Sequence, residues 1–326
     1  MKVLVTGATG FVATRLREVL RESGHDVRLL VRAESADRVK TIAPKDAYEI
    51  VRGSVFETNT CLHACDGRDA VVHLVGIIRE FPSMGITFDE VHRVATSNIV
   101  DAAKRSGVKR FIHMSALGAR DDAPSAYHRT KRAGERIVEG SGLLWTIFRP
   151  SWIFAPGDEL SRIIKDVARK PLVPLPGGGR ALVQPVSLDD VCACFARSLR
   201  MPETQGQIYE LGGIDRVSYR ELFEQAALLG GRKARTVSVP ASVIRPAVTL
   251  LQRFRSFPLT LDELRMLLED NICEIEPYVK AFGVTPVSFR DSMPAMFGKG
   301  ESRAAGRRDL KKKKGASRKP ERIICR

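Results

Sequence analysis

The opening segment MKVLVTGATGFVATRL constrains the fold of this 326-residue chain more than any other stretch. Apolar residues Val3–Val5 predict a short buried strand, and a helical pattern begins at Phe11. The turn between them is rich in glycine. In a strand–turn–helix unit, such a turn presents backbone N–H groups and the positive end of the helix dipole to a phosphate group. The unit therefore predicts a dinucleotide site, with a tight turn that binds nothing as the alternative.

Individual residues of this turn have distinct predicted roles. Gly7 can adopt the tight turn, and the missing side chain of Gly10 lets a pyrophosphate approach the backbone. Ala13 is small enough for the helix to pack closely on the strand. The predicted cofactor contacts of this unit are Gly7, Thr9, Gly10, Phe11 and Val12.

Apolar runs alternate with helical patterns along the chain as far as Pro150. This β-α-β-α rhythm predicts an α/β fold, a Rossmann-type doubly wound parallel sheet with helices on both faces. The predicted strands are 3–6, 27–31, 48–51, 71–74, 110–114 and 145–149, and the predicted helices are 11–23, 36–42, 91–106 and 127–141.

The chain divides into three predicted parts. Residues 1–150 form the NAD(P)-binding core, and residues 151–297 form a smaller C-terminal α/β lobe that completes the fold and shapes a substrate pocket. The lobe is expected because the pattern becomes less regular after Pro150. Its helical or strand patterns lie at 188–200, 208–211, 218–229 and 259–271. Residues 298–326 have no apolar periodicity and are predicted to form a disordered basic tail.

Most of the net charge of +15 lies in that tail. Residues 298–326 contain 12 Lys or Arg and 3 Asp or Glu, which leaves +6 of the +15 for the rest of the chain. The tail is a candidate contact for an anionic membrane surface, or a solubilising segment. It lacks the interleaved aromatic residues that support base stacking, so nucleic acid is a poor candidate partner. We expect a cytoplasmic protein without signal peptide or membrane span, with peripheral contact at the inner face of the plasma membrane as an option.

Arg32 directly follows the second predicted strand. An acidic residue at this place binds the ribose 2′-hydroxyl of NAD, whereas an arginine favours the 2′-phosphate of NADP. Arg15 and Arg28 add positive charge, although Arg28 lies within the strand. The predicted cofactor is therefore NADP(H), with NAD(H) as the second choice and an ordinary surface arginine as the alternative interpretation of Arg32.

Further cofactor contacts are predicted where later strands end. They are Ser54 and Val55 after the third predicted strand, Leu74, Val75 and Gly76 after the fourth, and Pro150 after the sixth. The adenine ring would lie against the first pair, and the cofactor's ribose would pass Gly76 because it has no side chain. A structural turn explains Gly76 almost as well.

Ser115, Tyr127 and Lys131 form the predicted catalytic set. Tyr127 and Lys131 are four residues apart on a predicted helix and so share one face, and Ser115 ends the fifth predicted strand. A phenol is a poor acid or base at neutral pH, but a nearby ammonium lowers its pKa. Lys131 can also hold ribose hydroxyls, so Tyr127 and Lys131 count among the predicted cofactor contacts, and the Ser115 hydroxyl can polarise a carbonyl group.

With these residues in this order, the chain resembles the short-chain dehydrogenase/reductase superfamily in its extended or atypical branch, over residues 1–290. Four segments narrow the resemblance to bacterial relatives of the short-chain-dehydrogenase-like accessory subunit of respiratory complex I. They are HLVGIIRE at 73–80, HMSALG at 113–118, WTIFRPS at 145–151 and QPVSLDDV at 184–191. The resemblance implies tightly bound NADPH and a link to quinone chemistry at a membrane.

Two positions depart from the family pattern. Ser54 stands where the family usually has an acidic residue that contacts adenine, and Ala155 stands where a glycine is common. A hydroxyl binds adenine less strongly than a carboxylate, and alanine has less backbone freedom. Neither change removes the catalytic set.

Two functions compete at this point. One is an NADP(H)-dependent oxidoreductase acting on an apolar carbonyl or quinone-related substrate, since Trp152, Ile153 and Phe154 suggest apolar pocket walls. Epimerase or dehydratase chemistry uses the same transient hydride and stays open. The other is a non-catalytic protein that holds NADPH and docks on a membrane respiratory complex. No metal site is predicted, because the six cysteines lack metal-ligand spacing.

Overall fold

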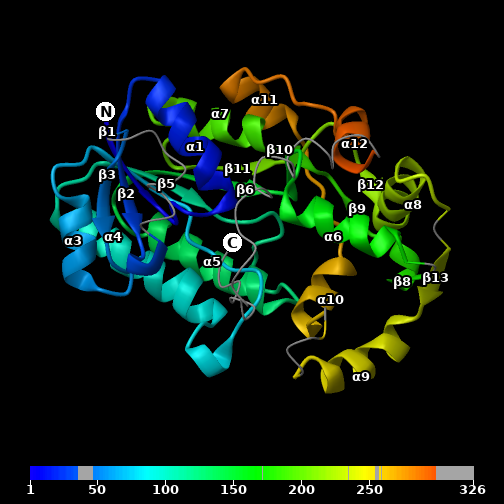
Figure 1. Cartoon of the computed structure of the whole chain (residues 1–326). Coiled ribbons are helices and arrows are strands. Elements are labelled where there is room, and N and C mark those ends of the chain that lie inside the picture. Colours follow the sequence, from blue (N-terminus) through cyan, green and yellow to red (C-terminus); the bar gives the residue numbers. More distant parts are fainter. Residues whose placement is uncertain (36–46, 171, 234, 254–256, 258, 299–326) are drawn as a thin grey trace, which may run out of the picture.

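Seven parallel strands form the central sheet of the computed structural model, in the order β11-β6-β5-β4-β1-β2-β3 (Figure 1). The structure describes residues 1–35, 47–170, 172–233, 235–253, 257 and 259–298. The strands are β1 (Lys2–Thr6), β2 (Asp26–Val31), β3 (Glu49–Arg52), β4 (Ala70–His73), β5 (Arg110–Met114), β6 (Leu144–Pro150) and β11 (Gln207–Leu211).

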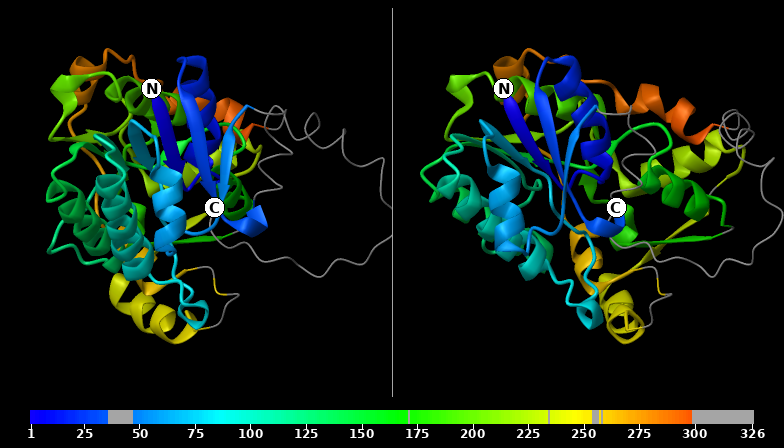
Figure 2. Two further views of the ribbon diagram at one scale, coloured as in Figure 1. Left: turned by 90° about the vertical axis from the view of Figure 1, so that its left-hand side faces the viewer. Right: turned by 60° about the vertical axis from the view of Figure 1, so that its left-hand side comes forward.

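Helices cover both faces of this sheet, as the two views in Figure 2 show. One layer holds α1 (Phe11–Glu22), α7 (Leu188–Ser198) and α11 (Glu276–Phe282), and the other holds α3 (Thr58–Cys65), α4 (Ala95–Arg105) and α5 (Ala126–Glu139). This arrangement confirms the predicted Rossmann-type α/β fold. It follows from strands that are apolar on both faces and therefore have to be covered twice.

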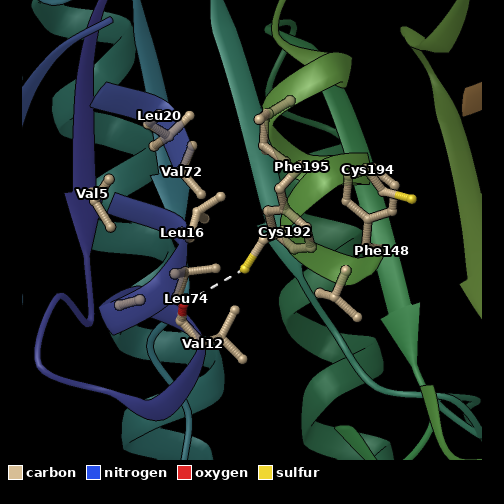
Figure 3. Close-up of a cluster of buried hydrophobic side chains, with 14 of the residues drawn as sticks. Val5, Val12, Leu16, Leu20, Val72, Leu74, Phe148, Cys192, Cys194 and Phe195 are labelled. Atoms are coloured by element: carbon tan, nitrogen blue, oxygen red, sulfur yellow. Dashed lines mark hydrogen bonds between the residues drawn. The ribbon is translucent and has the colours of Figure 1, made fainter. Parts of the chain in front are cut away.

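Each layer has its own apolar core. On the α1 side, Val12, Leu16 and Leu20 of α1 face Cys192 and Phe195 of α7 across the sheet surface (Figure 3). On the other side, buried residues of α3, α4 and α5 pack on the opposite faces of the same strands. The five cysteines that the structure describes are buried and free, so they act as small apolar core residues.

The remaining elements form a smaller region beyond the carboxyl end of β6. Its helices are α6 (Glu159–Ala168), α8 (Tyr219–Leu229), α9 (Ala241–Leu251), α10 (Leu261–Leu267) and α12 (Phe289–Phe297). Its strands pair two by two: β7 (Ile153–Phe154) with β10 (Val186–Ser187), β9 (Leu182–Val183) with β12 (Val217–Ser218), and β8 (Val173–Pro176) with β13 (Thr236–Val239). No described helix is both long and apolar enough to cross a bilayer.

Most predicted elements agree with the structure to within two residues. The predicted helix at 91–106 differs, because a π-helical segment at Asp89–Val94 precedes α4. The predicted helix at 36–42 lies outside the described residues, as does the predicted tail apart from Gly298. The division at residue 150 stays a prediction. β11 and α7, which come after it in sequence, belong to the main sheet and to one of its helical layers.

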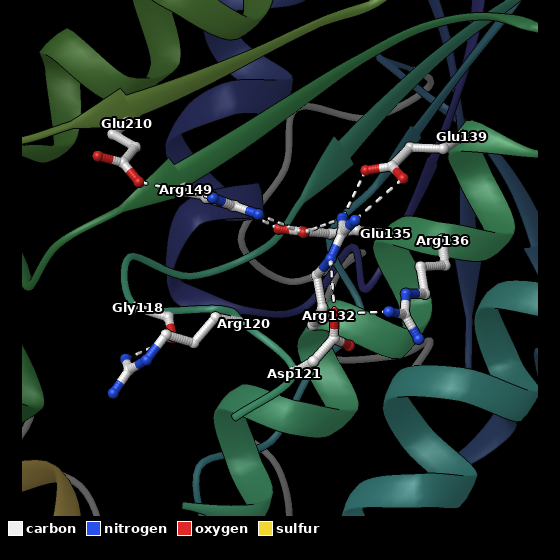
Figure 4. A network of polar contacts seen from close by, with 9 residues as sticks. All are labelled: Gly118, Arg120, Asp121, Arg132, Glu135, Arg136, Glu139, Arg149 and Glu210. Atoms are coloured by element: carbon white, nitrogen blue, oxygen red, sulfur yellow. Dashed lines mark hydrogen bonds and ion pairs between the residues drawn. The ribbon is translucent and has the colours of Figure 1, made fainter. Parts of the chain in front are cut away.

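A buried carboxylate fixes α5 against the sheet. Glu135 is 0% exposed and accepts two hydrogen bonds, of 2.7 and 2.6 Å, from the Arg149 guanidinium on β6. Arg132 donates a third, of 2.9 Å (Figure 4). A buried charge is tolerated only when it is paired and hydrogen-bonded, so these three side chains determine how α5 sits on β6.

We predict that Glu135→Gln destabilises the protein by about 3–5 kcal/mol, because the change leaves two partly buried guanidinium groups facing a neutral amide. The measurement is the free energy of unfolding from urea denaturation. Glu90→Gln is the matched control, since Glu90 is exposed, and should change it by less than about 0.5 kcal/mol. Equal effects of the two substitutions would contradict the role of Glu135.

Candidate functional site

All the predicted cofactor contacts on loops gather at one edge of the sheet. The strands are parallel, so the segments after their carboxyl ends lie side by side. The turn at 7–12 follows β1, Arg32 follows β2, Ser54 and Val55 follow β3, the stretch 74–76 follows β4, Ser115 follows β5, and Pro150 ends β6. In open α/β sheets this edge is where ligands bind.

The backbone of the glycine turn packs closely against the segment after β4. Gly7 has a φ of +69°, and a Cβ there would lie 2.9 Å from the Leu74 carbonyl carbon, so no other residue fits without strain. The Gly10 N–H donates to the Gly7 carbonyl at 2.9 Å and closes the turn. No side chain caps α1, and its first turn contains no acidic residue. The N–H groups at the start of α1 therefore have no partner from a cap, which suits an anionic ligand.

Thr9, Phe11 and Val12 lie at the start of α1 and differ in how far their side chains are buried. Phe11 is the first residue of the helix and is partly exposed, and Thr9 is half-buried. The Val12 side chain points into the α1–α7 core (Figure 3), so what Val12 offers a ligand is its backbone.

Arg32 stays the candidate for the 2′-phosphate and is half-buried directly after β2. Arg28, which was expected to add positive charge, is engaged within the protein. Its guanidinium donates to backbone carbonyls at the end of α3 and pairs with Glu49 at 2.8 Å. Arg15 pairs with Asp189 at 2.7 Å.

The segments after β3 and β4 contain the remaining predicted contacts. The Ser54 hydroxyl accepts from the Phe56 N–H at 3.2 Å, and the Val55 carbonyl accepts from the Asn98 side chain at 3.0 Å. Leu74 is buried in the core, whereas Val75 is partly buried. The two hydrogen bonds hold the segment after β3 in place at the sheet edge.

Lys131 links α5 to the ends of two strands. Its ammonium donates to the Met114 carbonyl on β5 at 2.7 Å, and a Cβ on Gly76 would lie 3.5 Å from the same nitrogen. Burial lowers the pKa of Lys131 to about 8. Ser115 is also buried, and its hydroxyl has no hydrogen-bond partner among the described residues. The structure thus brings a buried cation and an unpartnered hydroxyl to the same end of β5.

Tyr127 lies one turn before Lys131 on α5, with its ring edge-on to His92 and Phe88 at 5.4 and 5.8 Å between centroids. Burial raises the pKa of Tyr127 to about 12. The sequence-based expectation was the opposite, a pKa lowered by the lysine. The difference arises because these apolar surroundings disfavour the phenolate. A phenol with this pKa keeps its proton at neutral pH and is a weaker acid than a free tyrosine, so it gives the proton up only to a strong base.

A layer of buried histidines beneath the site was missed from the sequence. His73 lies between two hydroxyls, with Thr6 Oγ1 at 2.7 Å from Nδ1 and Thr96 Oγ1 at 3.2 Å from Nε2. Thr96 donates to the His92 carbonyl, so His73 donates through Nε2 and accepts through Nδ1, and stays neutral. Its ring stacks on His113 at 5.5 Å. The available signal was that His73 and His113 occupy paired positions on adjacent strands.

Burial lowers the pKa of all three histidines in this layer. For His73 the value falls to about 3, and for His92 and His113 it falls well below the ordinary 6.5. The neighbouring Lys131 ammonium acts in the same direction. These three histidines are therefore neutral polar side chains next to the Lys131 ammonium.

Asp262 is a second residue that sequence reasoning missed. It belongs to α10, and its carboxylate accepts from the N–H groups of Ala126 at 2.7 Å and Tyr127 at 3.0 Å. It therefore caps the helix that carries the catalytic candidates from 135 residues further along the chain. No local pattern could have signalled this contact.

Trp152 and Phe154, which were predicted to line an apolar substrate pocket, do not surround Tyr127. Phe154 and Trp152 pack on Phe289 of α12, at 5.0 and 5.5 Å between ring centroids, inside the core of the smaller region. The apolar side chains that surround Tyr127 come instead from the segment after β4, with Ile77 and Phe88 buried beside it. Among the described residues, no group of three or more His, Cys, Asp or Glu could hold a metal ion.

Comparison with known proteins identifies a nucleotide-binding class that agrees with this geometry. A family model described as NAD(P)H-binding matches residues 7–196. The chain is 30% identical over 261 residues to a ceramide reductase of Caulobacter vibrioides, covering 79% of this chain and 80% of that protein. It is 25% identical over 287 residues to the mitochondrial NADH-ubiquinone oxidoreductase 40 kDa subunit of Neurospora crassa, covering 86% and 75%.

Two solved structures show a similar fold. The crystal structure of gox2253 superimposes with a TM-score of 0.71 at 25% identity, covering 90% of this chain and 96% of that one. A nucleoside-diphosphate-sugar epimerase from Staphylococcus aureus gives 0.72 at 18% identity, covering 90% and 100%, which supports the fold.

The chain therefore belongs to the NAD(P)H-binding family, within the extended short-chain dehydrogenase/reductase group. Its relatives include complex I subunits, which confirms the resemblance stated from the sequence. A nicotinamide dinucleotide is the cofactor of this family, and the glycine turn, the uncapped α1 and the unpartnered Ser115 fit such a ligand.

We predict that the protein loses stability in acid because of the histidine layer. The folded state keeps these rings neutral, whereas the unfolded chain protonates them below about pH 6.5. As pH falls from 6.5 the unfolded state binds more protons, and each ring costs up to about 1.4 kcal/mol per pH unit. The measurement is the free energy of unfolding at pH 7 and pH 5.

His113→Phe removes one of these rings and should reduce the loss by about 1.4 kcal/mol per pH unit. His63→Gln is the control, since His63 is exposed, and should leave the pH profile unchanged. Parallel profiles for the wild type and the His113→Phe variant would contradict the prediction.

Proposed function

We propose that this chain is an NADP(H)-dependent reductase of a carbonyl group in an apolar, lipid-like or quinone-related substrate. The observation that carries the proposal is the placement of Lys131 and Ser115 at the end of β5. Lys131 bonds to the Met114 carbonyl beside Gly76, and the Ser115 hydroxyl is buried without a partner among the described residues. A pure nucleotide carrier has no chemical need for that hydroxyl.

The residues divide the chemistry between them. A bound reduced nicotinamide supplies a hydride to the carbonyl carbon. Ser115 donates a hydrogen bond to the carbonyl oxygen and orients it. Tyr127 gives its phenolic proton to the same oxygen, so that the carbonyl becomes an alcohol. Burial makes this phenol a weaker acid than usual, but the oxygen that gains the hydride's electrons is an alkoxide, a stronger base than a phenolate, and so takes the proton. Lys131 has three N–H donors, of which Met114 takes one, and the others are available to ribose hydroxyls.

The phosphates would bind at the glycine turn. Gly7 and Gly10 bring the backbone close, and the start of α1 supplies N–H donors without a competing cap. Arg32 would take the 2′-phosphate, which favours NADP(H) over NAD(H). Ser54 and Val55 after β3 would contact the adenine, the stretch 74–76 after β4 would contact the ribose, and Pro150 at the end of β6 would be a further contact of the cofactor.

Two observations favour an apolar substrate. Ile77 and Phe88 lie beside Tyr127, so a substrate at the phenol would meet apolar side chains. The Caulobacter relative is named for a lipid, ceramide.

A second candidate function is an accessory protein that holds NADPH without turning it over. The similarity to a respiratory complex subunit over 86% of this chain favours it. The two candidate functions differ in whether Tyr127 donates a proton to a substrate.

We predict that Tyr127→Phe lowers kcat by at least about 100-fold while the Kd for NADPH changes less than about threefold, because the substitution removes a proton donor and keeps the ring. The assay follows NADPH oxidation with a panel of long-chain ketones and quinones. Tyr209→Phe, which changes a tyrosine on β11, is the control and should keep full turnover. NADPH binding without turnover of any substrate in the unchanged protein would favour the accessory function instead.

We predict that Arg32→Ser weakens NADPH binding by about tenfold and leaves NADH binding unchanged, because a charge-assisted hydrogen bond to the 2′-phosphate is lost. Fluorescence titration of both cofactors measures this. Arg15→Ser is the control, since Arg15 pairs with Asp189, and should affect both cofactors equally. Tighter binding of NADH than of NADPH by the unchanged protein would rule out this use of Arg32.

A further inference from the structure

Helix α9 presents an apolar face away from the body of the protein. Val243, Pro246, Ala247 and Leu250 are all exposed and follow the spacing i, i+3, i+4, i+7, so they lie on one side of the helix. Val243 is 62% exposed and Leu250 is 57% exposed. Val248, the buried residue of α9, lies on the opposite side. A single exposed apolar residue is ordinary, whereas a continuous helical face of four marks a contact site.

The position of α9 leaves this face accessible. Figures 1 and 2 place α9 at the outer edge of the molecule, next to α10, with which it is in contact. α10 in turn reaches the start of α5, where Asp262 accepts from the N–H groups of Ala126 and Tyr127. The apolar face is thus one helix away from the catalytic candidates.

The stretch of sequence that contains α9 is basic. Residues 225–261 contain six Lys or Arg and no Asp or Glu. Arg245 is exposed on α9 itself, on the polar side of the helix with Thr249. The acidic side chains of the adjoining α10 are engaged elsewhere: Asp262 caps α5, and Glu263 pairs with Arg79 at 2.6 Å.

We propose that the α9 face docks on the surface of an anionic lipid bilayer. An exposed apolar stripe flanked by basic residues is the pattern of helices that lie in the membrane interface, where the apolar side enters the acyl boundary. Each basic residue near an anionic surface adds to the attraction. Two other occupants fit less well. The basic segment 299–326 and a second copy of this chain would both bring positive charge to a positive surface.

Docking through α9 has a consequence for substrate delivery. It would hold the α10–α5 junction near the lipid, so that an apolar substrate could reach Tyr127 without crossing water. This use of the contact rests on the proposed function, whereas the contact itself does not.

The test places a reporter on the face in the full-length protein. Leu250→Trp is compared with Leu228→Trp, because Leu228 is 60% exposed but lies on α8. Both variants are mixed with vesicles of phosphatidylcholine alone, of phosphatidylcholine with phosphatidylglycerol, and of the same mixture carrying brominated acyl chains. We expect Leu250→Trp to shift its emission to the blue on anionic vesicles and to be quenched by bromine, and Leu228→Trp to change little.

A second variant measures the contribution of the face to binding. Val243→Glu with Leu250→Glu should weaken vesicle sedimentation by at least about tenfold, because two apolar side chains no longer enter the lipid. Leu228→Glu is its control.

Absence of the Leu250→Trp shift, or equal shifts at both positions, would overturn the proposal and leave any binding to another part of the chain. A shift without vesicles that grows with protein concentration would overturn it in favour of a contact between copies. NADPH titration and turnover are read separately, so failure here leaves the proposed reaction standing.

Discussion

The site depends on one buried carboxylate. Tyr127, Lys131 and Glu135 are spaced by four residues and therefore lie along one side of α5. Glu135 is fixed by two hydrogen bonds from Arg149 on β6, so the rotation of the helix about its own axis is set at that point. The same rotation aims Lys131 at the Met114 carbonyl on β5. A charge that cannot be left unpaired in the interior thus determines where the candidate catalytic side chains lie.

Several hydrogen-bond donors lie at the sheet edge. Lys131 is buried, the Ser115 hydroxyl is unpartnered, and the N-terminus of α1 has no side-chain cap. Beneath them, the histidines stay neutral, because burial and the nearby ammonium both oppose protonation. Such an edge is complementary to a ligand rich in acceptors, such as the phosphate and hydroxyl oxygens of a dinucleotide.

What could be predicted from the sequence was local or periodic. The first strand, the glycine turn and the spacing of Tyr127 and Lys131 each occupy a short stretch of chain, and the β-α-β-α rhythm follows from apolar periodicity. Contacts between distant residues could not be predicted in this way. Arg28 illustrates the limit. A positive charge near the cofactor's ribose was a reasonable interpretation. The side chain instead donates to backbone carbonyls at the end of α3, and no local pattern around residue 28 predicts that contact.

The Asp262 cap has a consequence for the order in which the protein is assembled. During synthesis, α5 leaves the ribosome long before α10, and the N–H groups of Ala126 and Tyr127 stay without their acceptor until residue 262 follows. The edge strand β11 also comes late, after every other strand of the main sheet. A nascent chain can therefore complete its glycine turn early, but it cannot cap the end of α5 that carries the catalytic candidates until most of its length has been made.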